Sequence, residues 1–104
     1  MARTVQIAKA LASPTRLAIL GWLAEPEQHF TSRRDGDLSP AGVCASLIAE
    51  KAGIAAPTVS RHLDVLRQAE LIETQRAGGW NYHRPRRIGF EHARQLLERT
   101  LELP

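Results

Sequence analysis

The stretch PTVSRHLDVL, residues 57–66, combines two small hydroxyl side chains and an arginine with regularly spaced aliphatic residues. Val59, Leu63 and Leu66 follow one another at steps of four and three, which is the spacing of one face of an α-helix. The hydroxyl and guanidinium groups then point away from that face. Arginine can pair with guanine O6 and N7, and serine or threonine can contact bases or phosphates. The side chains of this helix that we predict to contact DNA are Thr58, Ser60 and Arg61.

A second group of side chains suited to nucleic acid is a run of arginines after this helix. Residues 76–94 contain five arginines and one acidic residue, Glu91. The guanidinium group matches the geometry of phosphate oxygens, so such a segment favours phosphate binding. A solvated surface would show the same excess, because a chain with an isoelectric point near 9.8 must expose arginines somewhere. Arg76 and Arg84 flank the Gly78–Gly79 pair, and we predict that these two contact phosphate.

The whole chain has the size and composition of one globular domain. It has 104 residues, of which 43% are hydrophobic and 24% charged, and its net charge is +3. The single cysteine excludes an internal disulfide and is typical of a reducing compartment. No apolar run is long enough to span a membrane, and the N-terminal residues lack the pattern of a secretory signal. We therefore expect one domain over residues 1–104, located in the cytoplasm and without membrane contact.

The segment at about residues 43–70 has the pattern of two helices joined by a tight turn. The first helix is predicted to begin near Val43. Gly53 supplies the left-handed backbone conformation that ends it, and Pro57 suits the first turn of the second helix. Ile54 is predicted to fill the angle between the two. This arrangement is a helix-turn-helix, whose second helix enters the major groove of DNA.

The remaining elements are a hairpin and amphipathic helices at the two ends of the chain. Residues at about 71–86 alternate between apolar and polar around two glycines, which predicts a β-hairpin, the wing. Apolar spacing predicts the first helix at about residues 4–12 and the last at about 88–102. Residues 26–42 are polar and rich in turn formers, which predicts a loop or a short irregular hairpin. The pattern indicates a mostly α-helical fold with a small β-hairpin, the winged helix-turn-helix.

Three passages, in this order, resemble the ArsR/SmtB family of small bacterial winged-helix repressors. They are KALASPTRLAILGWL (9–23), IAEKAGIAAPTVSRHLDVLRQAELI (48–72) and ETQRAGGWNYHRP (73–85). The resemblance implies a homodimer that is joined through its first and last helices and binds an imperfect inverted-repeat operator in double-stranded DNA. It also implies a protein that usually represses transcription and releases DNA in response to a signal. Arg16, in the first passage, is expected from the resemblance to be a structural ion-pairing residue.

The metal-sensing sites of that family do not match this chain. One family arrangement places a cluster of cysteines on the third helix, where this chain has Cys44 alone. Another places Asp and His ligands along the last helix, where residues 88–102 contain a single histidine. Three other candidate ligands precede Cys44 in the polar segment: His29, Asp35 and Asp37. The favoured interpretation is a surface turn followed by a buried cysteine, with no metal and no cofactor.

Two other classes of function fit the sequence less well. An enzyme is not indicated, because the chain has no Ser-His-Asp spacing, no phosphate-cradling glycine loop and no evident pair of catalytic carboxylates. A winged helix that serves as a protein-interaction module is the alternative. Such an interface favours exposed aliphatic or aromatic anchors where this chain has Ser60 and Arg61. The sequence therefore predicts a homodimeric, sequence-specific DNA-binding transcriptional regulator, a repressor released by an unidentified signal.

Overall fold

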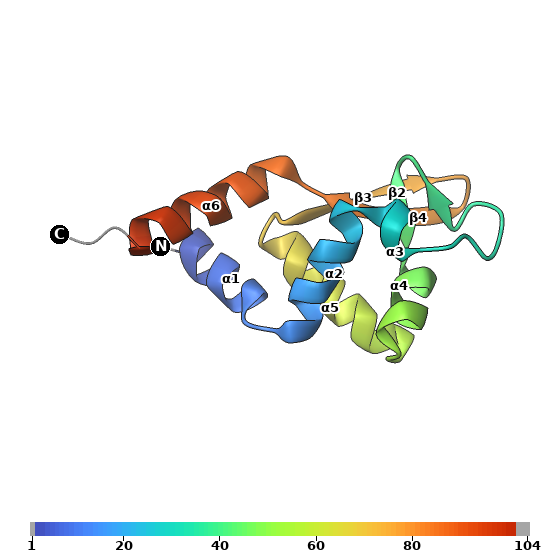
Figure 1. Ribbon diagram of the computed structural model, residues 1–104, viewed down its shortest axis with the longest axis horizontal. Coiled ribbons are helices and arrows are strands. Elements are labelled where there is room, and N and C mark those ends of the chain that lie inside the picture. The colour runs from blue at the N-terminus through green and yellow to red at the C-terminus, as the bar shows by residue number, and fades with distance from the viewer. Residues whose placement is uncertain (1, 102–104) are drawn as a thin grey trace.

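The computed structural model describes residues 2–101, and in this range the chain forms six helices and four short strands (Figure 1). The helices are α1 (Ala2–Leu11), α2 (Pro14–Ala24), α3 (Pro26–His29), α4 (Ala45–Ala52), α5 (Ala56–Gln68) and α6 (Arg87–Leu101). The strands are β1 (Leu38–Ser39), β2 (Gly42–Cys44), β3 (Ile72–Ala77) and β4 (Trp80–Pro85). The expected mostly α-helical chain with a β-hairpin is confirmed. No helix in this range is both long and apolar enough to cross a membrane.

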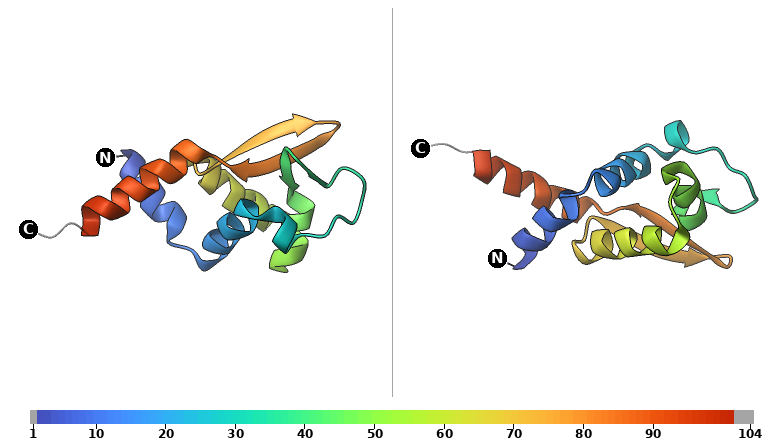
Figure 2. Two further views of the ribbon diagram at one scale, coloured as in Figure 1. Left: turned by 45° about the horizontal axis from the view of Figure 1, so that its top comes forward. Right: turned by 90° about the horizontal axis from the view of Figure 1, so that it is seen from below.

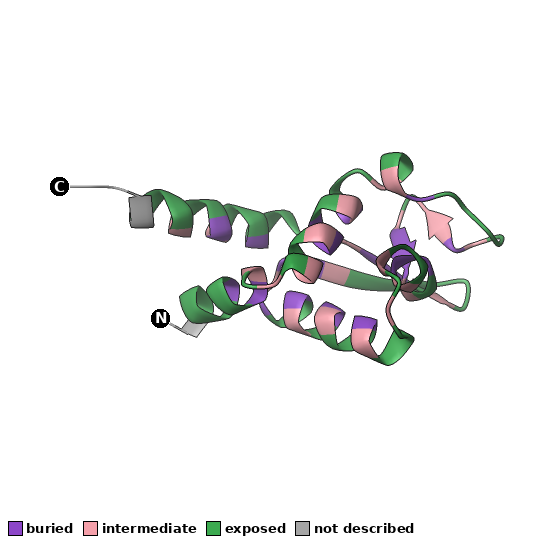
Figure 3. Cartoon of the chain, turned by 60° about the horizontal axis from the view of Figure 1, so that its bottom comes forward, coloured by how far each residue is buried: buried purple, intermediate pink, exposed green. Residues whose placement is uncertain are grey.

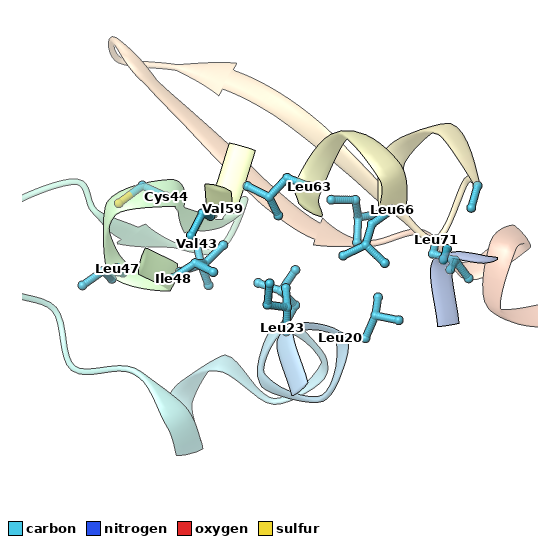
Figure 4. Close-up of a cluster of buried hydrophobic side chains, with 14 of the residues drawn as sticks. Leu20, Leu23, Val43, Cys44, Leu47, Ile48, Val59, Leu63, Leu66 and Leu71 are labelled. Atoms are coloured by element: carbon cyan, nitrogen blue, oxygen red, sulfur yellow. The ribbon is translucent and has the colours of Figure 1, made fainter. Parts of the chain in front are cut away.

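Helix α2 begins where the sequence offers both a cap and a proline. The Ser13 side chain accepts a hydrogen bond from the backbone N–H of Arg16 (3.2 Å), and Pro14 begins the helix. Its buried side chains are Ile19, Leu20 and Leu23. Helix α2 contacts both α4 and α5, so it is the support on which the helix-turn-helix rests (Figure 4).

The turn between α4 and α5 has the geometry predicted for it. Gly53 adopts the left-handed conformation (φ 68°, ψ 30°), and its N–H donates to the Ala49 carbonyl at 2.9 Å. Helix α5 buries its aliphatic face, Val59, Leu63 and Leu66, among side chains of α2 and α4 (Figure 4). Full burial of one such side chain contributes roughly 1.5–3 kcal/mol. The helix is therefore held by this face, and the opposite face is left to solvent.

The helix before this turn begins two residues later than predicted. Val43 and Cys44 belong to strand β2, and α4 begins at Ala45. Strand β2 pairs antiparallel with β4, with Val43 opposite His83. The prediction of a helix from Val43 is wrong, because an apolar residue ahead of a helix can equally be the buried end of a strand.

The wing belongs to a four-stranded antiparallel sheet in the order β1-β2-β4-β3. Strands β3 and β4 form a hairpin that projects from the helices beside α4 and α5 (Figure 2). The polar segment of residues 26–42 supplies α3, β1 and the start of β2, so it contains the short hairpin that was one of its two predicted forms. Gly42 allows β2 to pair with β4, because its φ is 132° and a Cβ there would lie 2.4 Å from the His83 carbonyl oxygen.

Burial is uneven between the two ends of the molecule (Figure 3). Helices α1 and α6 cross at the end away from the wing, and much of their surface is exposed (Figures 2 and 3). The large apolar side chains exposed on α1, α2 and α6 are Val5, Leu17, Ile88, Phe90 and Leu97. An apolar hollow of about 350 Å³ lies between α2 and α6, with Leu20 and Leu97 in its lining. Exposed apolar surface of this kind marks a place that another chain can cover.

Candidate nucleic-acid interface

The exposed face of α5 carries the three side chains predicted to contact DNA. Ser60 and Arg61 are exposed and Thr58 is half-buried, whereas Val59 between them is fully buried. None of the three polar side chains has a hydrogen bond or ion pair with another residue that the structure describes. The N-cap residue Ala55 provides no side-chain cap, so the partial positive charge of the helix start is uncompensated. The geometry leaves this end of α5 available to a polar or anionic ligand.

The two wing arginines predicted to contact phosphate differ in their surroundings. Arg76 is exposed, lies opposite Asn81 in the hairpin and has no partner within residues 2–101. Arg84 is half-buried and donates from Nε to Glu73 Oε1 at 3.2 Å, directly across the hairpin. A solvent-exposed ion pair contributes about 0–1 kcal/mol, so a phosphate can compete with Glu73 for this arginine. Only Arg76 is free of that competition.

A third arginine, which the sequence pattern does not single out, connects α5 to the wing. Arg67 forms an ion pair with Asp64 one turn earlier on α5, and its Nη1 donates to Thr74 Oγ1 on β3 at 3.0 Å. Thr74 Oγ1 lies 2.9 Å from His83 Nδ1 on β4. The spacing of Asp64 and Arg67 on an exposed helix face predicts their ion pair. Nothing in the local spacing predicts that Arg67 also reaches the strand beyond it.

His83 is the buried end of this chain of hydrogen bonds, with 5% of its surface exposed. Burial, and to a smaller extent the positive charge of Arg67, lowers the pKa of His83 to about 4. The imidazole is therefore neutral near pH 7. The Thr74 hydroxyl accepts a hydrogen bond from Arg67 and has one proton of its own, which it can donate to Nδ1. In the arrangement in which Thr74 donates to Nδ1, the ring proton is on Nε2.

The sequence of this chain, including its helix-turn-helix, is similar to known transcriptional regulators. Residues 39–74 match the family model described as bacterial regulatory protein, arsR family. The chain is 38% identical over 80 residues to the uncharacterized HTH-type transcriptional regulator YbzH of Bacillus subtilis, a match that covers 77% of this chain and 80% of that protein. The chain belongs to the ArsR family. It is also 36% identical over 75 residues to the transcriptional repressor SdpR of Bacillus subtilis, which covers 72% of this chain and 67% of that protein.

A solved structure supports the same assignment. The homodimeric winged helix-turn-helix DNA-binding domain Mb0332 of Mycobacterium bovis, a possible ArsR-family regulator, is 27% identical to this chain, with a TM-score of 0.64. The match covers 95% of this chain and 76% of that one. The predicted winged helix-turn-helix fold is thus confirmed, with α5 as the recognition helix and β3–β4 as the wing. As an ArsR-family protein, the chain is a transcriptional regulator and not an enzyme.

Arg16, in the passage that carries the ArsR-family resemblance, joins α1 to α5. Its Nε and Nη2 donate to the carbonyls of Ala10 and Lys9 at the end of α1, each at 2.8 Å. Its Nη1 donates to His62 Nδ1 at 3.2 Å. The ion pair expected for Arg16 does not form with any described residue, because the carbonyls at a helix C-terminus occupy the guanidinium. Burial and then the charge of Arg16 lower the pKa of His62, which suits its role as a neutral acceptor.

The candidate metal ligands lie near the β1–β2 hairpin. Within the part of the chain that the structure describes, no three His, Cys, Asp or Glu side chains form a group that could hold a metal ion. Asp37 is buried and accepts hydrogen bonds from Ser32 Oγ (2.8 Å) and from the N–H groups of Arg33 and Arg34 (3.0 Å each). Burial would raise the pKa of Asp37, but these hydrogen bonds and the charge of Arg34 lower it. The Asp37 carboxylate therefore organises its own loop.

The other three candidates also have structural surroundings. His29 is half-buried at the end of α3, and Asp35 is exposed in the following loop. Cys44 is buried at the end of β2, where its Sγ lies 3.1 Å from Ser46 Oγ. Cys44 packs in the hydrophobic core, as the sequence suggested for a small apolar side chain.

Proposed function

We propose that this ArsR-family regulator binds double-stranded DNA as a homodimer at an inverted-repeat operator, and that it represses transcription until a signal releases it. The observation that carries the proposal is the solvent-exposed face of α5, where Ser60 and Arg61 have no partner among the described residues. An arginine there can pair with guanine, and serine can contact a base or a phosphate. Arginines of the wing would add affinity by neutralising phosphates. Such a regulator would act where the DNA lies, in the cytoplasm.

The second copy is proposed to join at the terminal helices. Within a single domain over residues 1–104, α1 and α6 would serve dimerisation, and their exposed Val5, Phe90 and Leu97 would be covered by the partner. A two-fold dimer places its recognition helices about 34–36 Å apart, one turn of the double helix, or a multiple of that distance. Two equivalent helices read the same half-site in opposite directions, which is why an inverted repeat is expected. The Mb0332 domain is homodimeric, which supports the dimer itself.

Repression is supported by the relationship to SdpR, which is a transcriptional repressor. A bound protein blocks transcription when its operator overlaps the region that the polymerase occupies. The proposal therefore includes a measurable consequence, which is lower output from a reporter promoter that contains the operator.

The experiment that tests the proposal is selection of bound duplexes from a pool of random sequences. The expected result is enrichment of two related half-sites in inverted orientation, with loss of base preference in an Arg61→Ala variant. A reporter driven by the enriched site then tests repression. If no sequence is enriched over the starting pool, specific DNA recognition fails and the protein-interaction alternative takes its place.

A further inference from the structure

A cleft of about 410 Å³ lies between the recognition helix, the wing and the start of α4. Its lining includes Ser46 of α4, Ser60 of α5, and Asn81 and His83 of β4. All four can donate hydrogen bonds from their side chains. Ser60 and Asn81 have no side-chain partner within residues 2–101. Donors that come from three different elements thus meet at one hollow.

The most buried of these donors is His83. Only 5% of its surface is exposed, and its Nδ1 is hydrogen-bonded to the Thr74 hydroxyl. Its Nε2 has no hydrogen-bond partner among the described residues, and because it is not one of the fully buried unpartnered atoms, it can be reached from the cleft. With the ring proton on Nε2, His83 supplies the cleft with a donor that lacks an acceptor.

The start of α4 adds further donors. Ser46 lies in the first turn of this eight-residue helix, where N–H groups have no intrahelical acceptor. The N-cap residue Cys44 makes no side-chain capping bond, so these N–H groups remain uncapped. The partial positive charge at a helix N-terminus favours an anion. The side chains of His83 and Ser46 therefore meet a helix end that favours the same kind of ligand.

The charges that line the cleft are those of Arg67 and Asp64, which pair with each other. Their charges cancel, so the cleft has no net side-chain charge of its own. The cleft instead has more hydrogen-bond donors than acceptors to pair with them. A ligand with several acceptor oxygens can bond to several of these donors at once. Phosphoryl oxygens accept strongly from N–H and O–H groups.

We propose that this cleft binds one phosphoryl group, held by Ser46, Asn81, His83 and the N–H groups at the start of α4. The group can belong to the DNA backbone or to free phosphate or a small phosphorylated molecule. The first case rests on the proposed function, since it places a backbone phosphate between recognition helix and wing. In the second case, the anion occupies a site beside Ser60 and competes with DNA.

The first arm of the test uses inorganic phosphate and no DNA. Amide resonances of Ser46 and ring resonances of His83 are followed by NMR during a phosphate titration near pH 7, at ionic strength held constant with chloride. The expected result is saturable shifts at both residues. Asn81→Asp should weaken binding by about tenfold or more, because it replaces a donor by a repelling carboxylate.

Gln75→Glu is the matched control for Asn81→Asp. Gln75 pairs with Tyr82 and Asn81 with Arg76 in the hairpin, so successive positions place Gln75 on the opposite face from Asn81. Both variants add one negative charge to an exposed wing position. Gln75→Glu should leave phosphate affinity within about twofold, since only a screened long-range effect remains. Ser46→Ala, which removes a hydroxyl at an exposed position, provides a second variant in case Asn81→Asp perturbs the wing.

The second arm uses a bound duplex in which each backbone phosphate in turn becomes an uncharged methylphosphonate. If the phosphoryl group belongs to DNA, methylphosphonate at one position per half-site should weaken binding by the wild type about tenfold. The same substitution should not further weaken binding by the Asn81→Asp variant. A free-phosphate source predicts no such coupled position, together with displacement of DNA by phosphate beyond the effect of chloride. The proposal is overturned if phosphate gives no saturable shift and no position is coupled, or if Gln75→Glu weakens binding as much as Asn81→Asp. If no duplex binds at all, the proposed function fails while the phosphate titration still decides the cleft.

Discussion

The wing end and the terminal-helix end of this protein present opposite kinds of surface. At the wing end, exposed side chains are mostly polar, and arginines differ in whether a neighbour already holds them. Arg61 and Arg76 have no partner among the described residues, whereas Arg67 and Arg84 are each bonded to a carboxylate. At the other end, Leu97 is 53% exposed although it is apolar. The comparison teaches that exposure identifies an apolar interface, while a charged interface is identified by which side chains lack partners.

The largest expected effect lies at the terminal-helix end. Leu97→Lys should place a charge in the proposed dimer interface and separate the subunits, because an unpaired charge there loses its hydration. Operator affinity should then fall by roughly 10²- to 10⁴-fold, since two linked half-site readers gain that much from effective concentration. Light scattering should give twice the 11.5 kDa chain mass for the wild type and the single-chain mass for the variant.

Gln95→Lys is a matched control for this change, because it adds the same charge at an exposed polar position of α6. It should leave both mass and operator affinity close to wild type. If the wild type has the mass of a single chain across micromolar concentrations, the terminal helices do not form a dimer interface.

The next effect concerns the buried polar group at the wing end. The pKa of His83 is 6.5 as a free side chain and about 4 in the folded protein, so the unfolded chain takes up a proton that the folded chain excludes. The free energy of unfolding should therefore fall as the pH drops from 6.5 to about 4, by roughly 3 kcal/mol from this residue. Urea unfolding of wild type and His83→Gln over this range measures the difference.

The comparison with the variant isolates His83 from the carboxylates. Because the pKa of Asp37 is lowered, its carboxylate stays charged until the pH is below about 4. Its effect on the free energy of unfolding therefore appears only at lower pH than that of His83. His83→Gln should be less stable at pH 7 but should show a smaller loss on acidification. Equal slopes in both proteins would mean that the buried imidazole is not excluded from protonation.

A smaller effect separates arginines that read DNA from those that hold the wing. Arg61→Ala should cost about 1–3 kcal/mol of operator binding and reduce discrimination at particular base pairs, without changing the free energy of unfolding. Arg67→Ala should instead lower the free energy of unfolding by roughly 1 kcal/mol, because it removes hydrogen bonds to Asp64 and Thr74. Competition binding against single-base variants of the operator, with urea unfolding of each protein, tests the distinction. An Arg61→Ala protein with unchanged base preference would contradict the assignment of the reading face.

The fold and the division of α5 into a buried and an exposed face follow from local patterns, and the cleft between α5 and the wing does not. The spacing of Val59, Leu63 and Leu66 predicts the buried face of α5, because helix periodicity is a local property. The left-handed Gly53 likewise predicts the turn. The pairing of β2 with β4 brings together residues far apart in sequence, and the chain of hydrogen bonds that ends at His83 joins a helix to two strands. Such contacts depend on tertiary packing, which no spacing along one element encodes.

The smallest expected effect compares the two wing arginines. Arg76→Ala should weaken specific and random DNA alike and reduce the salt slope of binding by about one, because one phosphate contact is lost. Arg84→Ala should reduce DNA affinity less. Arg84 must break its ion pair with Glu73 before it can contact phosphate, and the lost ion pair offsets part of the energy of the phosphate contact. Glu73→Gln then sharpens the comparison, because it frees Arg84 and should strengthen DNA binding modestly. Salt titrations of binding to one operator and one random duplex measure all three variants. If Arg84→Ala lowers affinity more than Arg76→Ala, the ion pair across the hairpin does not restrain Arg84, and the presence of a partner is a poor guide to which arginine meets DNA.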